Sequence, residues 1–168
     1  HHSALYPSGH SGDITSDGAV TAHLKAGVPP SKLVMGMPFY GRGGDGYPSF
    51  QDYNKVGNTD TQYTEKWDEV AQVPYLADKN DTLVFGFENP RSLAIKCQYI
   101  LDKDLLGGMY WDYSGDNEQG DLRRTVAENL IGQAAQGEGT GVDGTWRTAR
   151  RIYGCRFEGG WRPKGVKG

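Results

Sequence analysis

The stretch LVMGMPFY, residues 33–40, is almost wholly apolar, and it constrains the fold more than any other feature of the chain. A strand with one exposed face alternates apolar and polar residues, whereas a parallel strand covered on both faces is continuously apolar. A buried helix would also be apolar throughout, but Gly36 and Pro38 disfavour a helix here. We therefore expect a parallel strand over 33–40 that is buried on both faces.

A helix is predicted immediately before this strand, within TSDGAVTAHLKAGVPPSK. Ser16 or Asp17 can cap its N-terminus. Val20 and Leu24 share one face at four-residue spacing. Gly27 suits the C-terminal cap, and the two prolines that follow block continuation of the helix.

A helix followed by an apolar strand is predicted a second time, in NPRSLAIKCQYILDKDLLGG and then GGMYWDYS. Asn89 can cap this helix, and Pro90 suits its first position. Its apolar stripe consists of Leu93, Cys97, Ile100 and Leu101. A third helix is indicated in GDLRRTVAENLIG by the four-residue spacing of Leu122, Val126 and Leu130. This alternation is typical of an α/β protein with parallel strands.

Residues 43–88, between the first strand and the second helix, have a different pattern. The segment begins with a glycine-rich stretch and ends in DTLVFGFE, where Leu83, Phe85 and Phe87 alternate with smaller residues. This alternation predicts a strand with one covered face. We expect a small inserted α+β subdomain beyond the carboxyl ends of the parallel strands, where such folds build binding walls.

Composition and charge exclude several classes of protein. The chain has 168 residues, of which 36% are hydrophobic and 23% charged, which fits one sizeable core better than a disordered segment. Its net charge of −3 gives no sign of a nucleic-acid or membrane partner. No apolar run approaches the ~20 residues of a membrane span, and the opening HHSALYPSGH lacks the signal-peptide pattern. The two cysteines, Cys97 and Cys155, form neither a disulfide framework nor a metal-binding spacing, so we expect no metal and no cofactor.

Residues 133–168 differ from the rest in charge, with seven Lys or Arg against three Asp or Glu. They begin with QAAQGEGTG, which is typical of a flexible linker. One interpretation of the remainder is a remnant of a carbohydrate-binding module that uses Trp146 and Trp161 as a stacking surface. A basic nucleic-acid arm is a weaker one, because seven charges come without a recognised module. We favour the third interpretation, an unstructured extension.

Four stretches together resemble the C-terminal half of family 18 glycoside hydrolases, the chitinases: HHSALYP, SKLVMGMPFYGR, TQYTEKWDEVAQVPYL and FENPRSLAIKCQYILDKDLLGGMYWDYSGD. Their order is similar to that of the family from the loop after strand six to helix eight. The resemblance covers about residues 1–132. It implies a partial (β/α)8 TIM barrel with barrel segments over 1–42 and 89–132 and the chitinase insertion subdomain over 43–88, while 133–168 lie outside it.

The resemblance also implies a sugar-binding role for residues at the strand ends. Trp111 matches the tryptophan that forms the floor beneath the sugar at the cleavage site, where a flat ring covers the apolar C–H face of a pyranose. Tyr40 and Arg42 match the end of strand seven, where a phenol and a guanidinium would hydrogen-bond sugar hydroxyls or N-acetyl groups. Weaker candidates for the cleft wall, each with core packing as the alternative, are Trp67, Tyr75, Phe87 and Glu88.

The family's catalytic motif is absent from this sequence. Family 18 enzymes hydrolyse β-1,4-linked N-acetylglucosamine with a protonated Glu as acid, while the acetamide oxygen of the substrate attacks the anomeric carbon. That Glu ends an Asp-x-x-Asp-x-Asp-x-Glu motif on strand four, which this chain does not contain. The local acids are better explained as caps and helix-dipole partners: Asp112, Asp116, Glu118 and Asp121. We therefore expect no catalytic residue here and no hydrolysis by this chain alone.

Two functions follow from the resemblance, both with chitin or chitooligosaccharides as ligand and the missing N-terminal half of the barrel as a partner. The chain is either the C-terminal portion of a chitinase or that of a chitinase-like lectin, which binds without hydrolysis. Only the residue at the end of the strand-four motif separates them. We prefer the enzyme because inactive members are the minority of the family. Since chitin is an extracellular polymer, the parent protein is expected to be secreted.

Overall fold

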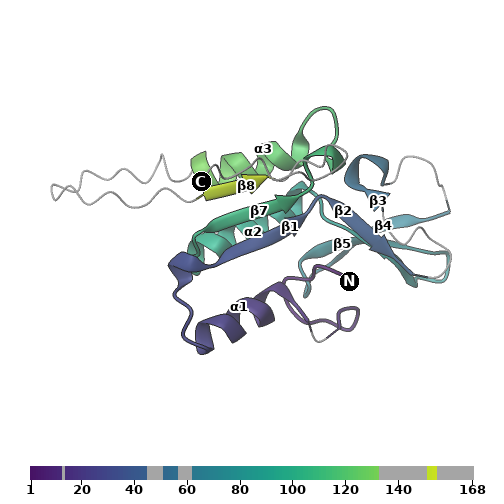
Figure 1. Cartoon of the computed structure of the whole chain (residues 1–168). Helices are drawn as coiled ribbons and strands as arrows, with labels where there is room; N and C mark the ends of the chain where they lie inside the picture. Colours follow the sequence, from purple (N-terminus) through teal and green to yellow (C-terminus); the bar gives the residue numbers. More distant parts are fainter. Residues whose placement is uncertain (13, 45–50, 57–61, 133–150, 155–168) are drawn as a thin grey trace, which may run out of the picture.

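The computed structural model describes residues 1–12, 14–44, 51–56, 62–132 and 151–154, which form two sheets and three α-helices (Figure 1). The parallel sheet has the strand order β1 (Val34–Pro38), β7 (Gly107–Trp111) and β8 (Arg151–Gly154). The antiparallel sheet has the order β3 (Gln51–Asp52), β2 (Tyr40–Gly43), β6 (Leu83–Gly86), β5 (Val73–Ala77) and β4 (Thr64–Asp68). The helices are α1 (Ser16–Lys25), α2 (Pro90–Asp102) and α3 (Asp121–Ala127).

The N-terminal cap of helix α1 lies one residue before the first of the two predicted caps. The cap is Thr15, whose backbone is extended and whose side chain accepts a backbone N–H of the first turn, while the residues predicted as caps already lie in the helix. At the other end, Gly27 has a φ of +88°, a conformation that glycine adopts without strain. Its N–H donates to the carbonyl of Leu24, and that of Val28 donates to His23, which completes a Schellman motif.

Helices α2 and α3 form as predicted. Asn89 caps α2, its side chain and that of Ser92 make a capping box, and Pro90 takes the first helical position. The predicted stripe faces the interior, where Leu93, Cys97 and Ile100 are inaccessible to solvent. Helix α3 continues as a π-helical turn, η4 (Glu128–Gly132), and presents three buried side chains to the same core: Leu122, Val126 and Leu130.

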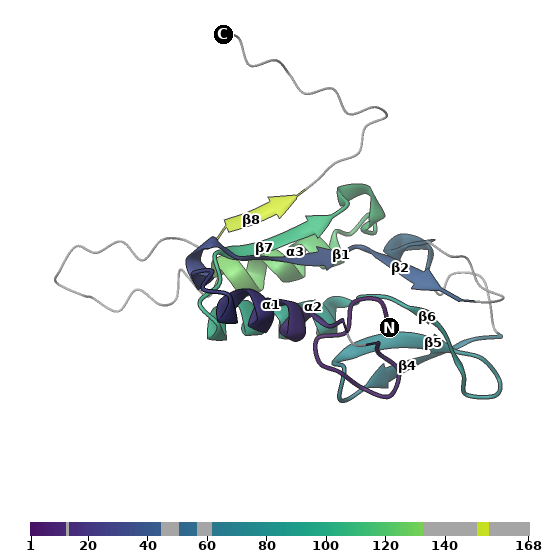
Figure 2. The same ribbon diagram turned by 60° about the horizontal axis from the view of Figure 1, so that its bottom comes forward.

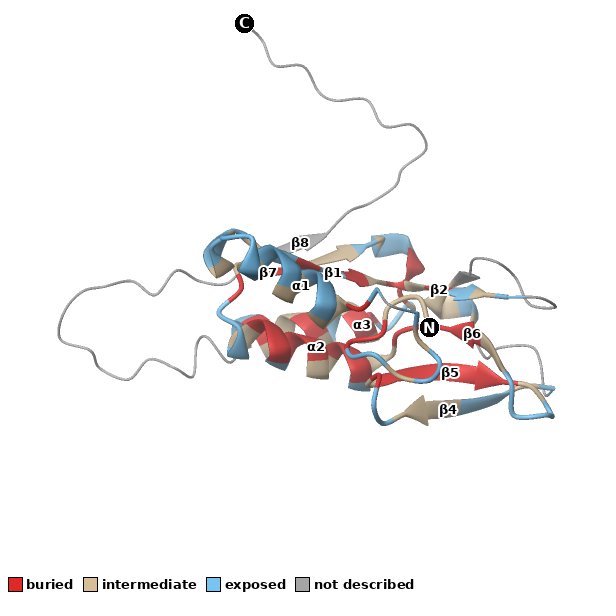
Figure 3. Cartoon of the chain, turned by 90° about the horizontal axis from the view of Figure 1, so that it is seen from below, coloured by how far each residue is buried: buried red, intermediate tan, exposed pale blue. Residues whose placement is uncertain are grey.

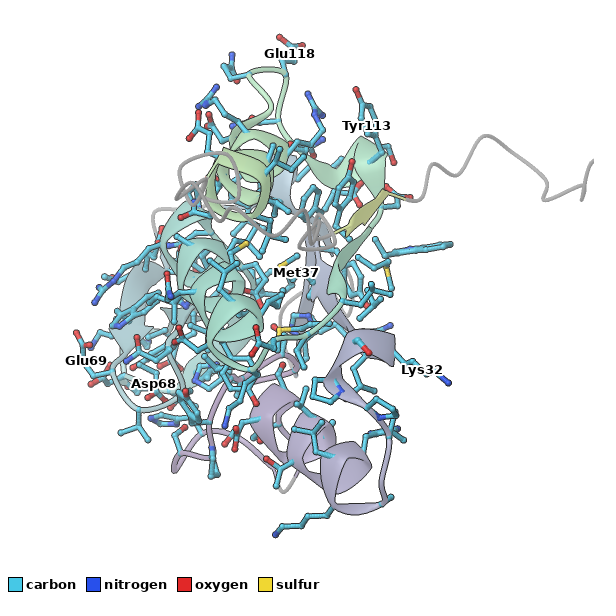
Figure 4. All side chains as sticks on the ribbon, turned by 90° about the vertical axis from the view of Figure 1, so that its left-hand side faces the viewer. Lys32, Met37, Asp68, Glu69, Tyr113 and Glu118 are labelled. Carbon is cyan, nitrogen blue, oxygen red and sulfur yellow. The ribbon has the colours of Figure 1, made fainter. Side chains whose placement is uncertain are left out.

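The parallel sheet is covered on one face only. Figure 2 shows the helices on one side of β1 and β7, and Figure 4 shows Met37 pointing between the strands and the helices. Met35 and Met37 are buried against this helical layer, whereas Val34 is 37% exposed on the opposite face. The prediction of a strand buried on both faces is therefore wrong, because no described element covers the second face.

In its described residues, the inserted segment is an antiparallel sheet without the α-helix that the predicted α+β unit would contain. Within its described residues, the helical structure is a single 3-10 turn, η2 (Tyr53–Lys55). The sheet begins at Tyr40, three residues before the predicted boundary, because the chain leaves β1 and re-enters a sheet as β2 with only Phe39 between them. The strand predicted from the alternation at 83–87 is confirmed as β6, and β5 beside it is buried along its whole length (Figure 3).

Part of the tail is a strand. β8 pairs with β7 in parallel, with Arg151 opposite Gly107 and Gly154 opposite Tyr110. The expectation of an unstructured extension is wrong for these four residues, because the open edge of β7 offers them backbone hydrogen bonds. The two tryptophans of the carbohydrate-binding interpretation, Trp146 and Trp161, lie outside the described residues.

Replacing Gly115 with alanine is expected to destabilise the fold by about 1–3 kcal/mol, as overpacking does. The added Cβ would lie 2.4 Å from the backbone carbonyl oxygen of Phe39, which cannot move without disturbing the end of the parallel sheet. Gly9→Ala is the matched control, because a Cβ at Gly9 would have no atom within 4 Å. Urea unfolding of both variants checks this, and equal stabilities would contradict the predicted clash.

Candidate functional site

Trp111 lies at the carboxyl end of β7, on the face away from the helices. Its carbonyl oxygen accepts the N–H of Phe39 at 2.7 Å, which ties the ends of β7 and β1 together. The preceding residue, Tyr110, stacks on Phe39 at 4.4 Å between ring centroids and packs against the core. Because side chains alternate along a strand, Trp111 points to the opposite face, where it is 41% exposed. The peptide bond between Trp111 and Asp112 is cis.

Tyr40 and Arg42 follow the carboxyl end of the neighbouring strand β1. They are two residues apart on β2 and therefore lie on one face of it. The Arg42 guanidinium carbon is 5.7 Å from the centroid of the Tyr40 ring, and the ring of His2 lies 5.5 Å from the same ring. The structure thus brings a phenol and a guanidinium to the strand end beside the one that carries the indole of Trp111.

Glu88 lies in the interior between the chain's first residues and helix α2. Its side chain is fully buried and forms an ion pair with the equally buried Lys96. Its two carboxylate oxygens also accept hydrogen bonds from the hydroxyls of Ser3 at 2.7 Å and Ser92 at 2.6 Å. Sugar contact at Glu88 stays a prediction that this buried position does not support.

The aromatic candidates of the insertion are also occupied by contacts within the protein. The ring of Trp67 is covered by the guanidinium of Arg91, whose central carbon lies 3.8 Å from the ring centroid. Tyr75 is 9% exposed, and Phe87 is 3% exposed within an apolar cluster. One face of the Trp67 ring is therefore occupied within the protein, and its role in sugar binding remains a prediction.

Two of the four acids that the sequence indicates as caps, Asp112 and Asp116, accept backbone N–H groups at the start of helical turns. Asp112 accepts backbone N–H groups of Ser114 and Gly115, in the 3-10 turn η3 (Tyr113–Gly115). Asp116 accepts those of Leu122 and Arg123 at the start of α3. These bonds satisfy N–H groups that a helix leaves without intrahelical partners.

The region around Glu88 contains a buried cation, Lys96, that was not predicted from the sequence. Lys96 is the fourth residue after Ser92 on α2, and it follows Leu93 by three, which places it within the apolar stripe. A lysine at such a position signals either a snorkelling side chain or a buried ion pair. The acidic partner, Glu88, stands eight residues before Lys96, and the sequence predicted it as part of the cleft wall instead.

Stability is expected to rise with pH between about 4 and 6.5 because of His2. Burial, together with the positive charges of Lys96 and Arg42, lowers the pKa of His2 from 6.5 to about 4. The unfolded chain therefore binds a proton in this range that the folded chain does not, so stability is fully present above pH 6.5 and falls towards pH 4. Urea unfolding at several pH values checks this, and His2→Gln should flatten the profile more than His23→Gln on the exposed side of α1.

Other kinds of site find little support in the described residues. None of their helices is long and apolar enough to cross a membrane, and no three His, Cys, Asp or Glu side chains among them are grouped as a metal site. Burial raises the pKa of the Cys97 thiol to about 12, which keeps it protonated. The described part of the chain is thus an α/β protein whose exposed aromatic and polar side chains gather where parallel strands end, the edge at which such folds bind ligands.

Comparison with known proteins gives the family. The model of glycosyl hydrolases family 18 matches residues 1–116, and the chain belongs to this family. Chitinase A1 of Niallia circulans is 35% identical over 121 residues, which cover 58% of this chain. The solved chitinase ChiW of Paenibacillus sp. is 32% identical with a TM-score of 0.68 over 77% of this chain. The Group IV chitinase of Ostrinia furnacalis, solved in complex with allosamidin, is 26% identical with a TM-score of 0.67, also over 77% of this chain.

The chain spans only part of these proteins. It covers 17% of Chitinase A1, 17% of ChiW and 45% of the Ostrinia furnacalis structure. The likeness to these family 18 structures, together with the mixed α/β fold, places the chain in the TIM-barrel class.

Proposed function

We propose that this chain is the C-terminal portion of a chitinase and supplies part of its sugar-binding surface. The ligand is chitin or another polymer of β-1,4-linked N-acetylglucosamine. The observation that carries the proposal is Trp111, an exposed indole at the carboxyl end of β7 with Tyr40 and Arg42 beside it on the neighbouring strand end.

Each of these side chains has a definite task in binding. The indole of Trp111 lies beneath the sugar, covers its C–H face and excludes water from it. The Tyr40 hydroxyl can both donate and accept a hydrogen bond, and the Arg42 guanidinium donates from a rigid fork to hydroxyl or acetamide oxygens. Together they fix the plane and the rotation of one sugar unit.

We further propose that other parts of the whole protein supply the rest of the barrel. The uncovered face of the parallel sheet supports this, because in a closed barrel that face packs against the other strands. In the whole protein the acid would protonate the glycosidic oxygen while the substrate's acetamide oxygen attacks the anomeric carbon. The barrel segments are residues 1–42 and 89–132, the insertion is 43–88, and the parent protein is secreted.

The alternative parent, a chitinase-like lectin, would use the same floor and the same two polar residues. The curated relatives favour the enzyme, since Chitinase A1 and the endochitinase of Manduca sexta are named as chitinases. Both candidate parent proteins lead to the same expectation, that this chain binds chitooligosaccharides.

The proposal is tested by mixing the purified chain with chitin beads and measuring both retention and the release of soluble sugars. We expect the beads to retain the chain and soluble N-acetylglucosamine oligomers to displace it. We expect no release of soluble sugars from the beads. Release of oligomers would show that the chain holds its own catalytic acid. No retention of a folded sample would contradict the binding role.

A further inference from the structure

A cavity lies beside the antiparallel sheet, apart from Trp111, Tyr40 and Arg42, none of which lines it. We call it the seam cleft, and its volume is about 430 Å³. It is bounded by η2, by β4, by Phe87 just after β6 and by the segments that begin α2 and α3. This volume is within the ~300–1,000 Å³ of small-molecule sites and large enough for a sugar ring.

Two amide side chains of the seam cleft are held in fixed positions. Asn89 accepts the N–H of Ser92 at 3.0 Å as the cap of α2. Asn117 accepts the N–H of Asp121 at 3.0 Å and donates to the carboxylate of the same residue at 2.7 Å. Each amide has two N–H donors and two lone pairs, so these bonds leave capacity for a ligand. Amides held in this way need no reordering when a hydroxylated ligand binds.

The charge of the seam cleft is negative. Glu65 of β4 lines it and accepts a hydrogen bond from the amide of Asn89 at 3.2 Å, and none of the described residues that line the cleft is Lys, Arg or His. Burial raises the pKa of the Tyr53 hydroxyl in this cleft, and the nearby carboxylates of Asp121, Asp116 and Glu65 raise it further. The N–H groups at the start of α2 and α3 are already bonded by Asn89 and Asp116, so no open helix end attracts an anion.

The apolar part of the lining suits the flat side of a sugar. Tyr53 and Phe87 contribute aromatic rings and Pro90 contributes an aliphatic one. Apolar side-chain rings next to amides and a carboxylate suit a sugar. The apolar rings contact the C–H groups of the sugar, and the polar groups hydrogen-bond its hydroxyls. The negative charge then excludes phosphorylated and acidic sugars and favours a ligand with a positive group.

We propose that the seam cleft binds a sugar unit that carries a protonated amine, as glucosamine does. The ammonium group lies at the Glu65 carboxylate, the hydroxyls bond the amides of Asn89 and Asn117, and one face of the ring lies against Tyr53 and Pro90. This site is separate from the acetamide-binding floor at Trp111. It would let the protein hold deacetylated units of the same kind of polymer.

The test is a calorimetric titration of the full chain with glucosamine, N-acetylglucosamine and glucose. We expect glucosamine to bind more tightly than the other two, and added salt to weaken its binding, because a charge-assisted bond distinguishes it. Glu65→Gln should weaken the binding of glucosamine about tenfold, because one hydrogen bond to a charged group is lost. Glu69→Gln is the control. Glu69 carries the same charge four residues further along the chain, pairs with Arg91 and does not line the cleft.

Two outcomes would overturn this assignment. One is equal affinity for glucosamine and glucose, and the other is loss of glucosamine binding in Glu69→Gln as large as in Glu65→Gln. Trp111→Ala separates the two sites, since it should leave glucosamine binding unchanged while it removes the binding of N-acetylglucosamine oligomers. Circular dichroism of each variant confirms that it is folded.

Discussion

Replacing Lys96 with alanine is expected to lower the free energy of unfolding by about 3–5 kcal/mol, the usual cost of removing one partner of a buried ion pair. Lys96 and Glu88 have fully buried side chains and pair directly. Without the lysine, the carboxylate of Glu88 would remain in the interior with only the hydroxyls of Ser3 and Ser92 as partners. It would then have to stay charged without a cation or take up a proton.

Urea unfolding measures this loss, and two further variants show its cause. The double variant Lys96→Met with Glu88→Leu removes both charges and should recover most of the stability, because no unpaired charge remains. Lys55→Ala breaks an exposed pair with Asp52 and should cost no more than about 1 kcal/mol. A loss of similar size for Lys96→Ala and Lys55→Ala would contradict the buried pair.

Local chemistry made much of the fold predictable. Asn89, Pro90 and the glycine after α1 are residues whose side chains or backbone freedom act within one helical turn, so helix ends could be read from the chain. The strand at β7 and the capping role of Asp116 depend on neighbours a few residues away. The position of Trp111 at a strand end followed from the same abrupt change from apolar to polar residues.

Long-range contacts made the rest unpredictable. Whether β1 is covered on one face or two depends on elements distant in the chain, and its apolar sequence is the same in either case. The pairing of β8 with β7 joins segments more than 40 positions apart, and nothing in RIYG alone selects that partner. Glu88 has the residue type expected of a cleft wall, and only its contact with Lys96 shows that it is buried.

Trp111→Ala is expected to weaken the binding of N-acetylglucosamine oligomers at least ~30-fold, which corresponds to the roughly 2 kcal/mol lost at an aromatic hot spot. Its indole is 41% exposed, so removing it takes away the contact surface of the sugar and leaves the core packing of Tyr110 and Phe39 in place. Stability should therefore change little. Tyr113→Ala is the matched control, because Tyr113 is an aromatic residue of equal exposure two positions further on.

One measurement tests the proposed sugar site most directly, the calorimetric titration of a chitooligosaccharide into the unmodified chain, Trp111→Ala and Tyr113→Ala. We expect the unmodified chain and Tyr113→Ala to bind with similar affinity and Trp111→Ala to show almost no heat of binding. Equal affinity in all three folded proteins would mean that the end of β7 does not bind the sugar, and it would contradict the proposed function.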